Sequence, residues 1–397
     1  MGCSSTKHDG VPTEEDDTAR GRSGSLERTL APNSSSRYST GNVDLHYAYM
    51  SRRGYYPKSP NKRNQDAFVI KTNFGGFEDR VMFAVFDGHG PVGDQCACFC
   101  RDTLPGNLVN ELKSLTINDP WASEEEIKKA LTSAFVLTNK QLRKDREIED
   151  EQSGTTCIMA LLFGKVLFVA NCGDSRAIMA TGTDTLESVP LSHDQTPYRK
   201  DERDRVMVAG ARIMNMGQME GMVPRQSPDS WGDIQIGENP DEDHDPPRVW
   251  HKTEPHPGAA FTRSLGDAEA EKLGVFAEPE IHVQELEQKD QFLCVMSDGV
   301  TEFLTNDTIC KMVKKHPDPL PACKELVDES YAAWMDMDYR TDDITIICIH
   351  LGDVTADTGE QSNEKAHTPH ERRSLRRRGS LNISETGHFS NIVPPAS

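Results

Sequence analysis

Residues 155–181, TTCIMALLFGKVLFVANCGDSRAIMAT, carry the pattern that decides the fold class of this chain. Three short apolar runs follow one another here, and only the glycine-containing links GK and GDS separate them. Short apolar runs bounded by glycine are typical of buried strands. Links this short allow hairpins but no parallel crossover, so we predict an antiparallel sheet.

Other elements follow from the same kind of pattern. The apolar run VMFAVF at 81–86 predicts a buried strand. Ser123 and Glu126 form a capping box, which predicts the start of a helix that ends near Arg143. Further strands are predicted at 280–286, 291–297 and 343–351, and further helices at 302–316 and 321–335. We therefore predict an α+β fold in which two packed, mainly antiparallel β-sheets are flanked by α-helices.

Composition divides the chain of 397 residues into three parts. Residues 1–42 are rich in Ser, Thr, Gly and charge, which predicts a disordered tail, and the polar residues 353–397 predict another. Residues 43–352 are long enough for one domain, which we expect to be a monomer. The formal net charge of −20 argues against nucleic acid as a partner, because phosphate binding needs a basic surface.

Most of the ten cysteines lie within apolar runs, and no secretory signal opens the chain. This pattern is typical of free thiols in a reducing compartment, so we expect a cytoplasmic protein. Cys96, Cys98 and Cys100 suggest a zinc site, but no C-x-x-C pair accompanies them. We favour buried packing for these three side chains.

The N-terminal sequence MGCSST fits the acylation pattern, because removal of Met1 exposes Gly2. Cys3 is placed to receive a second acyl chain, and two chains hold a protein stably at a membrane surface. The alternative is a flexible Ser-rich terminus without a lipid. We expect a membrane-associated protein, although no apolar run is long enough to span a bilayer.

The C-terminal stretch ERRSLRRRGSLN places Ser374 and Ser380 shortly after arginines. Basic residues ahead of a serine suit basophilic kinases, so we predict regulatory phosphorylation at both serines. A phosphate there would also weaken attraction of the basic tail to an anionic membrane. A solvated basic tail and a nuclear signal are the alternatives.

Aspartates recur at the ends of the predicted strands. They are Asp66, Asp87, Asp194, Asp298 and Asp342. Glycine follows Asp87 and Asp298, and a single Asp-Gly pair is ordinarily a turn. Five strand-end aspartates in one domain, one of them in the sequence DGHG, indicate clustered carboxylates, which need a cation to remain ionised together. Hard divalent cations with oxygen ligands are the chemistry that suits such a cluster.

An ordered series of short motifs resembles the metal-dependent serine/threonine protein phosphatases of type 2C, in particular plant-like and protist-like members. The motifs are KRNQD (62–66), FDGHG (86–90), SGTT (153–156), NCGDSRA (171–177), AFTRSLGD (260–267), SDGV (297–300) and TDDIT (341–345). The resemblance implies a double β-sandwich flanked by helices, with residues 199–258 as a flap that helps to select substrates.

The resemblance also implies two Mn²⁺ or Mg²⁺ ions in a cleft at one edge of the sandwich. Asp87 would bridge the ions, and the carbonyl of Gly88 would bind one of them. Asp298 and Asp342 would be further direct ligands, with Asp66 as an additional acidic position.

Two more residues take roles from the resemblance. Asp194 matches a position that can hold a weaker third ion. His89 would be the general acid, because a departing serine alkoxide needs a proton and histidine can give one near neutral pH.

The chain departs from the pattern of many members at two positions. Asn61 stands where an arginine holds the substrate phosphate, which leaves Lys62 and Arg63 as candidates for that role. Gln65 stands where animal members have glutamate.

The resemblance thus implies an enzyme that hydrolyses phosphoserine and phosphothreonine on phosphoproteins by attack of a metal-bridging water. The alternative is a pseudophosphatase that keeps the fold for binding, which the presence of Asp87, Asp298 and Asp342 disfavours. A metal-dependent nuclease is disfavoured by the acidic charge.

Overall fold

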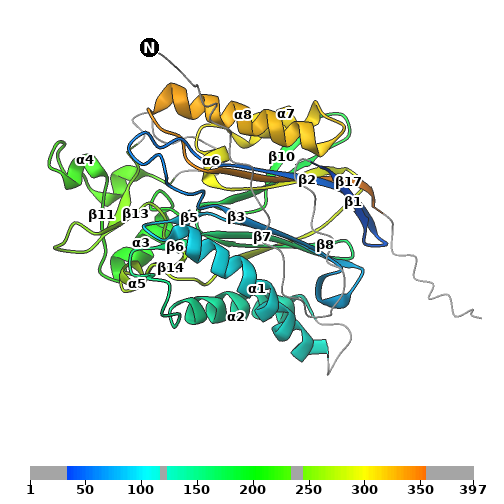
Figure 1. Ribbon diagram of the computed structural model, residues 1–397, viewed down its shortest axis with the longest axis horizontal. Coiled ribbons are helices and arrows are strands. Elements are labelled where there is room, and N and C mark those ends of the chain that lie inside the picture. Colours follow the sequence, from blue (N-terminus) through cyan, green and yellow to red (C-terminus); the bar gives the residue numbers. More distant parts are fainter. Residues whose placement is uncertain (1–33, 117–122, 234–244, 355–397) are drawn as a thin grey trace, which may run out of the picture. The chain divides into compact units, whose positions relative to one another are not determined.

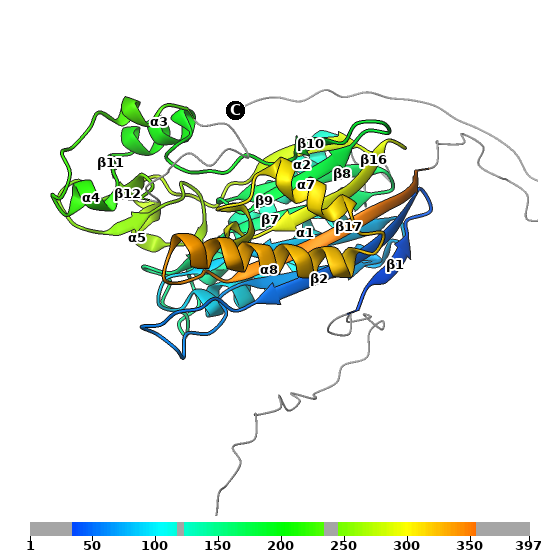
Figure 2. The ribbon, with the colours of Figure 1, turned by 90° about the horizontal axis from the view of Figure 1, so that it is seen from above.

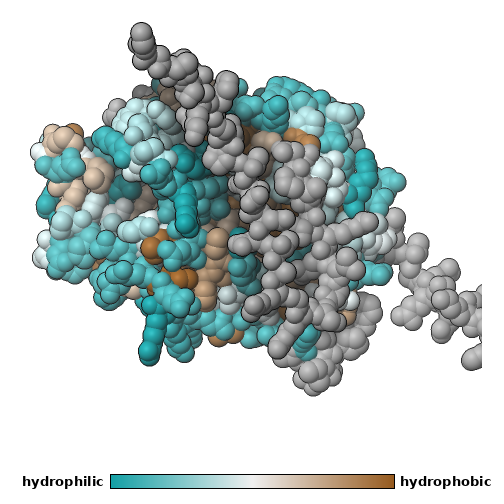
Figure 3. All heavy atoms as spheres, viewed as in Figure 1, coloured by the Kyte–Doolittle hydropathy of each residue, from teal (hydrophilic) through white to brown (hydrophobic). Residues whose placement is uncertain are grey.

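The computed structural model describes residues 34–116, 123–233 and 245–354. Two β-sheets pack face to face, and helices cover the outer face of each sheet (Figure 1). The predicted α+β sandwich is confirmed. Most of the coloured residues seen in Figure 3 are hydrophilic, as expected for the outside of such a sandwich.

The first sheet has six strands in the order β1-β2-β17-β16-β9-β10. Every neighbouring pair in it is antiparallel. Its strands are β1 (Ser36–Ser39), β2 (Val43–Arg52), β17 (Ile344–Val354), β16 (Asp290–Met296), β9 (Arg176–Thr181) and β10 (Glu187–Pro190).

The second sheet has five strands in the order β15-β8-β7-β4-β3, again with antiparallel neighbours. Its strands are β15 (Glu280–Glu285), β8 (Val166–Cys172), β7 (Cys157–Phe163), β4 (Arg80–Phe86) and β3 (Ala67–Thr72). The predicted strands at 81–86 and 157–172 are therefore present.

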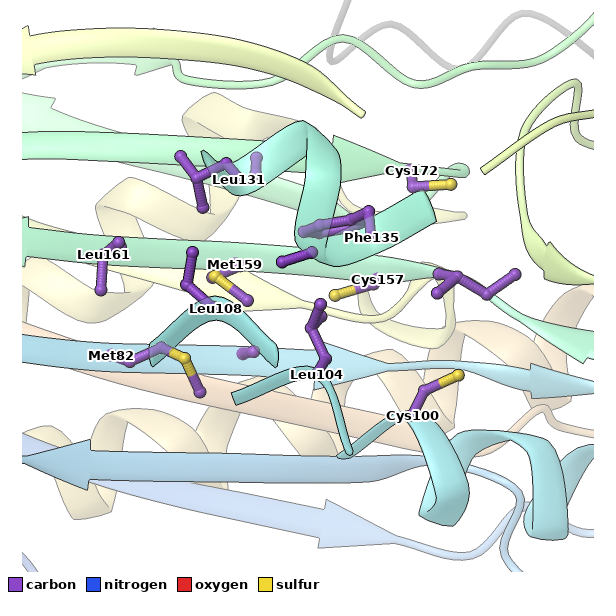
Figure 4. Close-up of a cluster of buried hydrophobic side chains, with 14 of the residues drawn as sticks. Met82, Cys100, Leu104, Leu108, Leu131, Phe135, Cys157, Met159, Leu161 and Cys172 are labelled. Atoms are coloured by element: carbon purple, nitrogen blue, oxygen red, sulfur yellow. The ribbon is translucent and has the colours of Figure 1, made fainter. Parts of the chain in front are cut away.

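Side-chain alternation along β4 explains the layers. Met82, Ala84 and Phe86 point toward the helices, whereas Val81, Phe83 and Val85 point toward the other sheet. A strand of this kind is buried on both faces, so it is apolar throughout. Figure 4 shows the helical side of this sheet, where Met82 and Met159 lie among leucines of the covering helices.

Two helices cover each sheet. α1 (Gly93–Thr116) and α2 (Glu124–Leu142) pack on the five-stranded sheet, and α7 (Asn306–Lys314) and α8 (Pro319–Met337) lie across the six-stranded sheet (Figure 2). The capping box predicted for α2 is confirmed, since the Ser123 side chain accepts from the Glu126 backbone and the Glu126 side chain accepts from the Ser123 backbone.

A small subdomain, which we call the flap, lies at the end of the sandwich where β5 (Gly88–His89) is found (Figure 1). It contains α3 (Lys200–Val208), β11 (Arg212–Met214), α4 (Met216–Met219), η2 (Pro228–Trp231), β12 (Arg248–Trp250) and β13 (Pro257–Ala259). Its own apolar cluster includes Val206, Ile213 and Val249. β5 pairs with β6 (Gly154–Thr155), which pairs with β14 (Leu265–Gly266), and α5 (Ala268–Glu271) follows.

The structure corrects two sequence-based expectations. β7 and β8 form the predicted hairpin, but β9 lies in the other sheet, so the link Gly173–Ser175 carries the chain from one sheet to the other. Residues 36–39 form the edge strand β1, although they fall inside the tail predicted for 1–42. Its pairing with β2 supplies the order that its polar composition did not predict.

The described cysteines are free thiols. Cys96 and Cys100 are buried on α1, and burial raises the pKa of Cys96 to about 12, so it is a packed side chain and not a reactive one. Among the described residues, no helix is long and apolar enough to cross a membrane.

Candidate active site

Strand ends from both sheets meet at a cavity of about 730 Å³ beside the flap. Asp87 follows β4, Asp298 begins α6 (Asp298–Thr301) directly after β16, and Asp342 lies just before β17. All three carboxylates line the cavity, as do Gly88 and His89 of β5. Residues that are far apart in the sequence are therefore brought to one wall.

The carboxylates of this cavity repel one another. Burial, and then the charge of Asp298, raises the pKa of Asp87 well above its ordinary value. Burial, and then the charge of Asp342, raises the pKa of Asp298 to about 6. Carboxylates in this arrangement are fully ionised at neutral pH only when cations neutralise them.

One carboxylate oxygen of Asp66, next to this cluster, lacks a hydrogen-bond partner among the described residues. Asp66 does not line the cavity, and its Oδ2 accepts a hydrogen bond from Ser297 Oγ at 2.9 Å. Its Oδ1 is buried and has no partner among the described residues. An unpartnered, buried carboxylate oxygen beside other carboxylates fits a hard divalent cation, which favours oxygen ligands. The residues present thus fit Mg²⁺ or Mn²⁺.

Hydrogen bonds fix the direction of Asp342. Its Oδ1 accepts from the hydroxyl of Tyr56 at 2.6 Å and from the backbone N–H of Asp343 at 2.9 Å. Asp343 itself accepts from the backbone N–H groups of Gly54 at 2.6 Å and Gln65 at 2.8 Å. Asp343 therefore fastens two chain segments together, while Asp342 faces the cavity.

The glycine next to Asp87 is required by close packing of the backbone. A Cβ at Gly88 would lie 2.3 Å from the carbonyl oxygen of Gly93 and 2.5 Å from that of Gln65. Gly90 has a φ of 84°, and a Cβ there would lie 2.1 Å from the carbonyl oxygen of Gln152. These contacts explain the pattern D-G-H-G, since any larger residue would displace the strand end that carries Asp87.

His89 is held by an acidic partner. Its Nε2 lies 2.6 Å from Oδ2 of Asp267, which also accepts a hydrogen bond from Ser264 Oγ at 2.6 Å. The imidazole also lies against the ring of Phe261, with 4.3 Å between centroids. A carboxylate on one ring nitrogen fixes the orientation of the imidazole.

Sequence reasoning missed Asp267, Asp174 and Glu302. Asp174 and Glu302 line the cavity, and burial raises the pKa of Asp174 well above its ordinary value and that of Glu302 to about 7. A weaker signal was present for the two aspartates, because each follows a glycine at a strand end, whereas Asp87 follows its strand directly and precedes a glycine. Glu302 carries no comparable signal.

Asp194, predicted to hold a third ion, is engaged otherwise. It lines the cavity, but Arg176 Nε donates to its Oδ1 at 3.0 Å and Arg176 Nη2 donates to its Oδ2. A guanidinium that contacts both oxygens already neutralises this carboxylate. Asp174 and Glu302 are therefore better placed than Asp194 to meet an additional cation.

The two cations predicted to contact the substrate phosphate lie in different places. Lys62 lines the cavity, and its Nζ lies 3.8 Å from the centroid of the Tyr56 ring. Arg63 is not among the residues that line the cavity; its side chain is 82% exposed and lies 3.5 Å from Asp94. Only Lys62 is in position to meet a group bound in the cavity.

Another acidic cluster, Asp201, Glu202 and Glu280, lies at the base of the flap. Arginines surround it: Arg199 pairs with Asp201 and Glu280, and Arg263 pairs with Glu202 at 2.8 Å. These hydrogen bonds from arginines outweigh burial and hold the pKa of Glu202 at about 2. The cluster is therefore an ion-pair network that anchors the flap, and not a free metal site.

The metal-free protein is expected to lose stability as the pH rises from about 5 to about 8. Asp298 and Glu302 have folded-state pKa values of about 6 and about 7, whereas such groups titrate near 4 in unfolded chains. The folded state then binds more protons than the unfolded state, so the free energy of unfolding falls with rising pH. Thermal melts in EDTA measure this slope.

Glu302→Gln serves as the matched variant for these melts, because it should flatten the slope between about pH 6 and pH 8. Added Mn²⁺ should raise the melting temperature most at the high-pH end, where the carboxylates are ionised. A melting temperature in EDTA that climbs steadily from about pH 5 to pH 8 would contradict the like-charge description of the cavity.

Comparison with known proteins shows which family the chain belongs to. A family model described as "Protein phosphatase 2C" matches residues 58–335 of the chain. The chain therefore belongs to the protein phosphatase 2C family, and it is a phosphatase of that family.

Individual relatives agree with this assignment. The chain is 42% identical over 312 residues to "Probable protein phosphatase 2C 35" of Arabidopsis thaliana, which covers 78% of this chain and 85% of the relative. It is 29% identical over 315 residues to "Probable protein phosphatase 2C 73" of Oryza sativa subsp. japonica, covering 72% of this chain and 69% of the relative. The predicted plant-like character is thus confirmed.

Solved structures show the same fold. The serine-threonine phosphatase 2C from Toxoplasma gondii aligns with a TM-score of 0.59 at 17% identity, covering 82% of this chain and 98% of that one. A C. elegans sex determining protein aligns with a TM-score of 0.56 at 19% identity, covering 77% of this chain and 64% of that one.

Four of the predicted sites fall outside the residues that the structure describes. They are Gly2 and Cys3 for lipidation and Ser374 and Ser380 for phosphorylation. Membrane attachment, the cytoplasmic location and the action of a basophilic kinase therefore stay predictions.

Proposed function

We propose that the chain hydrolyses phosphoserine and phosphothreonine esters on proteins with the help of two divalent cations, Mn²⁺ or Mg²⁺. Asp87, Asp298 and Asp342 would hold the cations together with the carbonyl oxygen of Gly88. The observation that carries the proposal is the convergence of these carboxylates from three strand ends on one cavity with His89. Their mutual repulsion is what a pair of cations would relieve.

When bound, the two cations would supply a water of lowered pKa as the nucleophile and would neutralise charge on the phosphoryl group. His89 would give a proton to the serine or threonine oxygen as it leaves. Because Asp267 occupies Nε2 of His89, the transferable proton would come from Nδ1. Asp267 would act as a positioning residue, since it contacts the imidazole.

Lys62 would contact the substrate phosphate in place of an arginine at position 61. It is the predicted cation that lines the cavity, and the Tyr56 ring beneath its Nζ limits where the ammonium can move. An ammonium is a point charge without the two-pronged geometry of a guanidinium. We therefore expect Lys62 to contribute attraction to the phosphate more than exact orientation.

The test is release of phosphate from a phosphothreonine peptide by the full-length chain with Mn²⁺, with Mg²⁺ and with EDTA. We expect hydrolysis to require added metal, with EDTA lowering the rate by roughly 100-fold or more. Equal rates with and without EDTA would contradict the proposal. Binding of the peptide in Mn²⁺ without any hydrolysis would instead identify a pseudophosphatase.

A further inference from the structure

The segment 51–63, SRRGYYPKSPNKR, joins β2 to β3 and carries five positive charges without one acidic residue. This is unusual in a chain whose formal net charge is −20. One of the five, Arg52, is directed to α8, where it pairs with Asp328 at 3.3 Å and stacks on the ring of Tyr331. The remaining cations are Arg53, Lys58, Lys62 and Arg63.

The segment is fastened to the residues that precede β17. The backbone N–H of Tyr55 donates to Thr341 Oγ1 at 2.7 Å, and the N–H of Thr341 donates to the carbonyl of Tyr55 at 3.0 Å. Gly54 lies so close that a Cβ there would be 2.5 Å from the carbonyl oxygen of Thr341. The neighbouring Arg340 therefore belongs to the same surface, which we call the basic rim: Arg53, Lys58, Lys62, Arg63 and Arg340.

Most side chains of the basic rim are held by groups other than carboxylates. Lys62 and Lys58 lie over the rings of Tyr56 and Tyr339, at 3.8 Å and 5.4 Å from the ring centroids. Arg53 donates to the carbonyl oxygens of Gly54 and Pro60. An aromatic ring or a carbonyl positions a cation without removing its charge.

Two acidic side chains do reach the basic rim. Arg340 Nε donates to Asp338 Oδ2 at 3.1 Å, and Arg63 lies 3.5 Å from Asp94. Both are exposed contacts, which screen the charges only in part. The charges of Asp342 and Asp343 also act on Arg340 and Lys62, so the excess of positive charge lies mainly at the exposed side chains of Arg53, Lys58 and Arg63.

The basic rim is continuous with the active site. Lys62 and Arg340 line the cavity that also holds Asp87 and His89. Lys58 and Arg63 extend the positive charge outward from it, and both side chains are exposed. A peptide whose phosphorylated residue reaches His89 can therefore place the residues on one side of it over these cations.

We propose that the basic rim binds acidic residues that flank the phosphoserine or phosphothreonine of the substrate, so that the enzyme prefers acidic phosphopeptides. This inference rests on the proposed phosphatase function. An anionic membrane is negatively charged as an acidic peptide is, but a flat lipid surface does not reach Lys62 and Arg340, which line the cavity. Opposite charges across such an interface raise the rate of encounter and select the partner.

The test compares the wild-type chain with the double variant Lys58→Glu, Arg63→Glu, because neither residue lines the cavity. The substrates are two phosphothreonine peptides of equal length, one with Asp and Glu flanks and one with Lys and Arg flanks, and p-nitrophenyl phosphate. We expect KM for the acidic peptide to rise about tenfold and KM for the basic peptide to fall. The kinetics with p-nitrophenyl phosphate should not change.

Lys289→Glu, Lys311→Glu is the matched control, because it changes the net charge equally at exposed lysines outside the cavity. The double variant Lys58→Ala, Arg63→Ala removes both charges without reversing them, so it is less disruptive to folding. It should raise KM for the acidic peptide about threefold. Thermal melts report the folding of every variant.

Several results would overturn the proposal. They are an unchanged KM for the acidic peptide in both rim variants, an equal rise in the control, and loss of binding to phosphatidylserine vesicles without any change toward peptides. Failure of the wild-type chain to hydrolyse any of the three substrates would instead contradict the proposed function, so the two failures are distinguishable.

Discussion

Replacing Asp298 with asparagine is expected to lower kcat for a phosphothreonine peptide by about 10²–10³-fold. The charge of Asp298 acts on Asp87, and the charge of Asp342 acts on Asp298. The amide cannot supply the negative charge that a bound cation needs, and one lost electrostatic contact in an active site costs about 10²–10³ in rate. Steady-state kinetics in saturating Mn²⁺ measure the loss.

A binding readout separates this effect from a folding defect. In EDTA near pH 7.5, Asp298→Asn should melt at a higher temperature than wild type, because it removes one of several mutually repelling carboxylates. Added Mn²⁺ should stabilise the wild type strongly and the variant weakly. Asp328→Asn, at an exposed position on α8, should behave like wild type in both respects. A variant that keeps the Mn²⁺-dependent rise in melting temperature would contradict a ligand role for Asp298.

The second large effect is expected for His89→Gln, which should lower kcat for a phosphoserine peptide by about 10²–10³-fold. A serine oxygen is a poor leaving group and needs the proton that His89 would give. Nitrophenolate leaves without protonation, so the rate with p-nitrophenyl phosphate should fall by less than about tenfold. The measured quantity is the ratio between the loss of kcat with the phosphoserine peptide and the loss of rate with p-nitrophenyl phosphate.

Asp267→Asn tests the positioning role of the carboxylate on His89 Nε2. It should reduce the peptide rate in the same selective manner but by a smaller factor, about tenfold, because the imidazole remains while its orientation loosens. Equal losses with the peptide and with p-nitrophenyl phosphate in His89→Gln would remove the general-acid assignment.

Local sequence patterns predicted much of the sandwich. The apolar run at 81–86 became β4, and the capping box at Ser123 became the start of α2. Both are features whose physics is contained within a few consecutive residues. The prediction for the link Gly173–Ser175 was wrong because local sequence does not determine where the next strand goes. The length of the link permits a hairpin, and only packing between the sheets decides that β9 joins the six-stranded sheet.

The same contrast between local sequence features and long-range packing applies to the candidate site. Strand-end carboxylates such as Asp87 and Asp298 were visible because each follows an apolar run. The bond between His89 and Asp267 joins residues 178 positions apart, and no local pattern indicates it. The contact of Asp194 with Arg176 was hidden for a related reason, since it depends on how the loop after β10 returns to β9.

The most direct test of the central claim is a crystal of the chain grown with Mn²⁺ and measured at the manganese absorption edge. We predict two anomalous peaks in the cavity, both in contact with the carboxylate of Asp87 and flanked by Asp298 and Asp342. A cavity without peaks at saturating Mn²⁺, or peaks confined to the cluster of Asp201, Glu202 and Glu280, would contradict it.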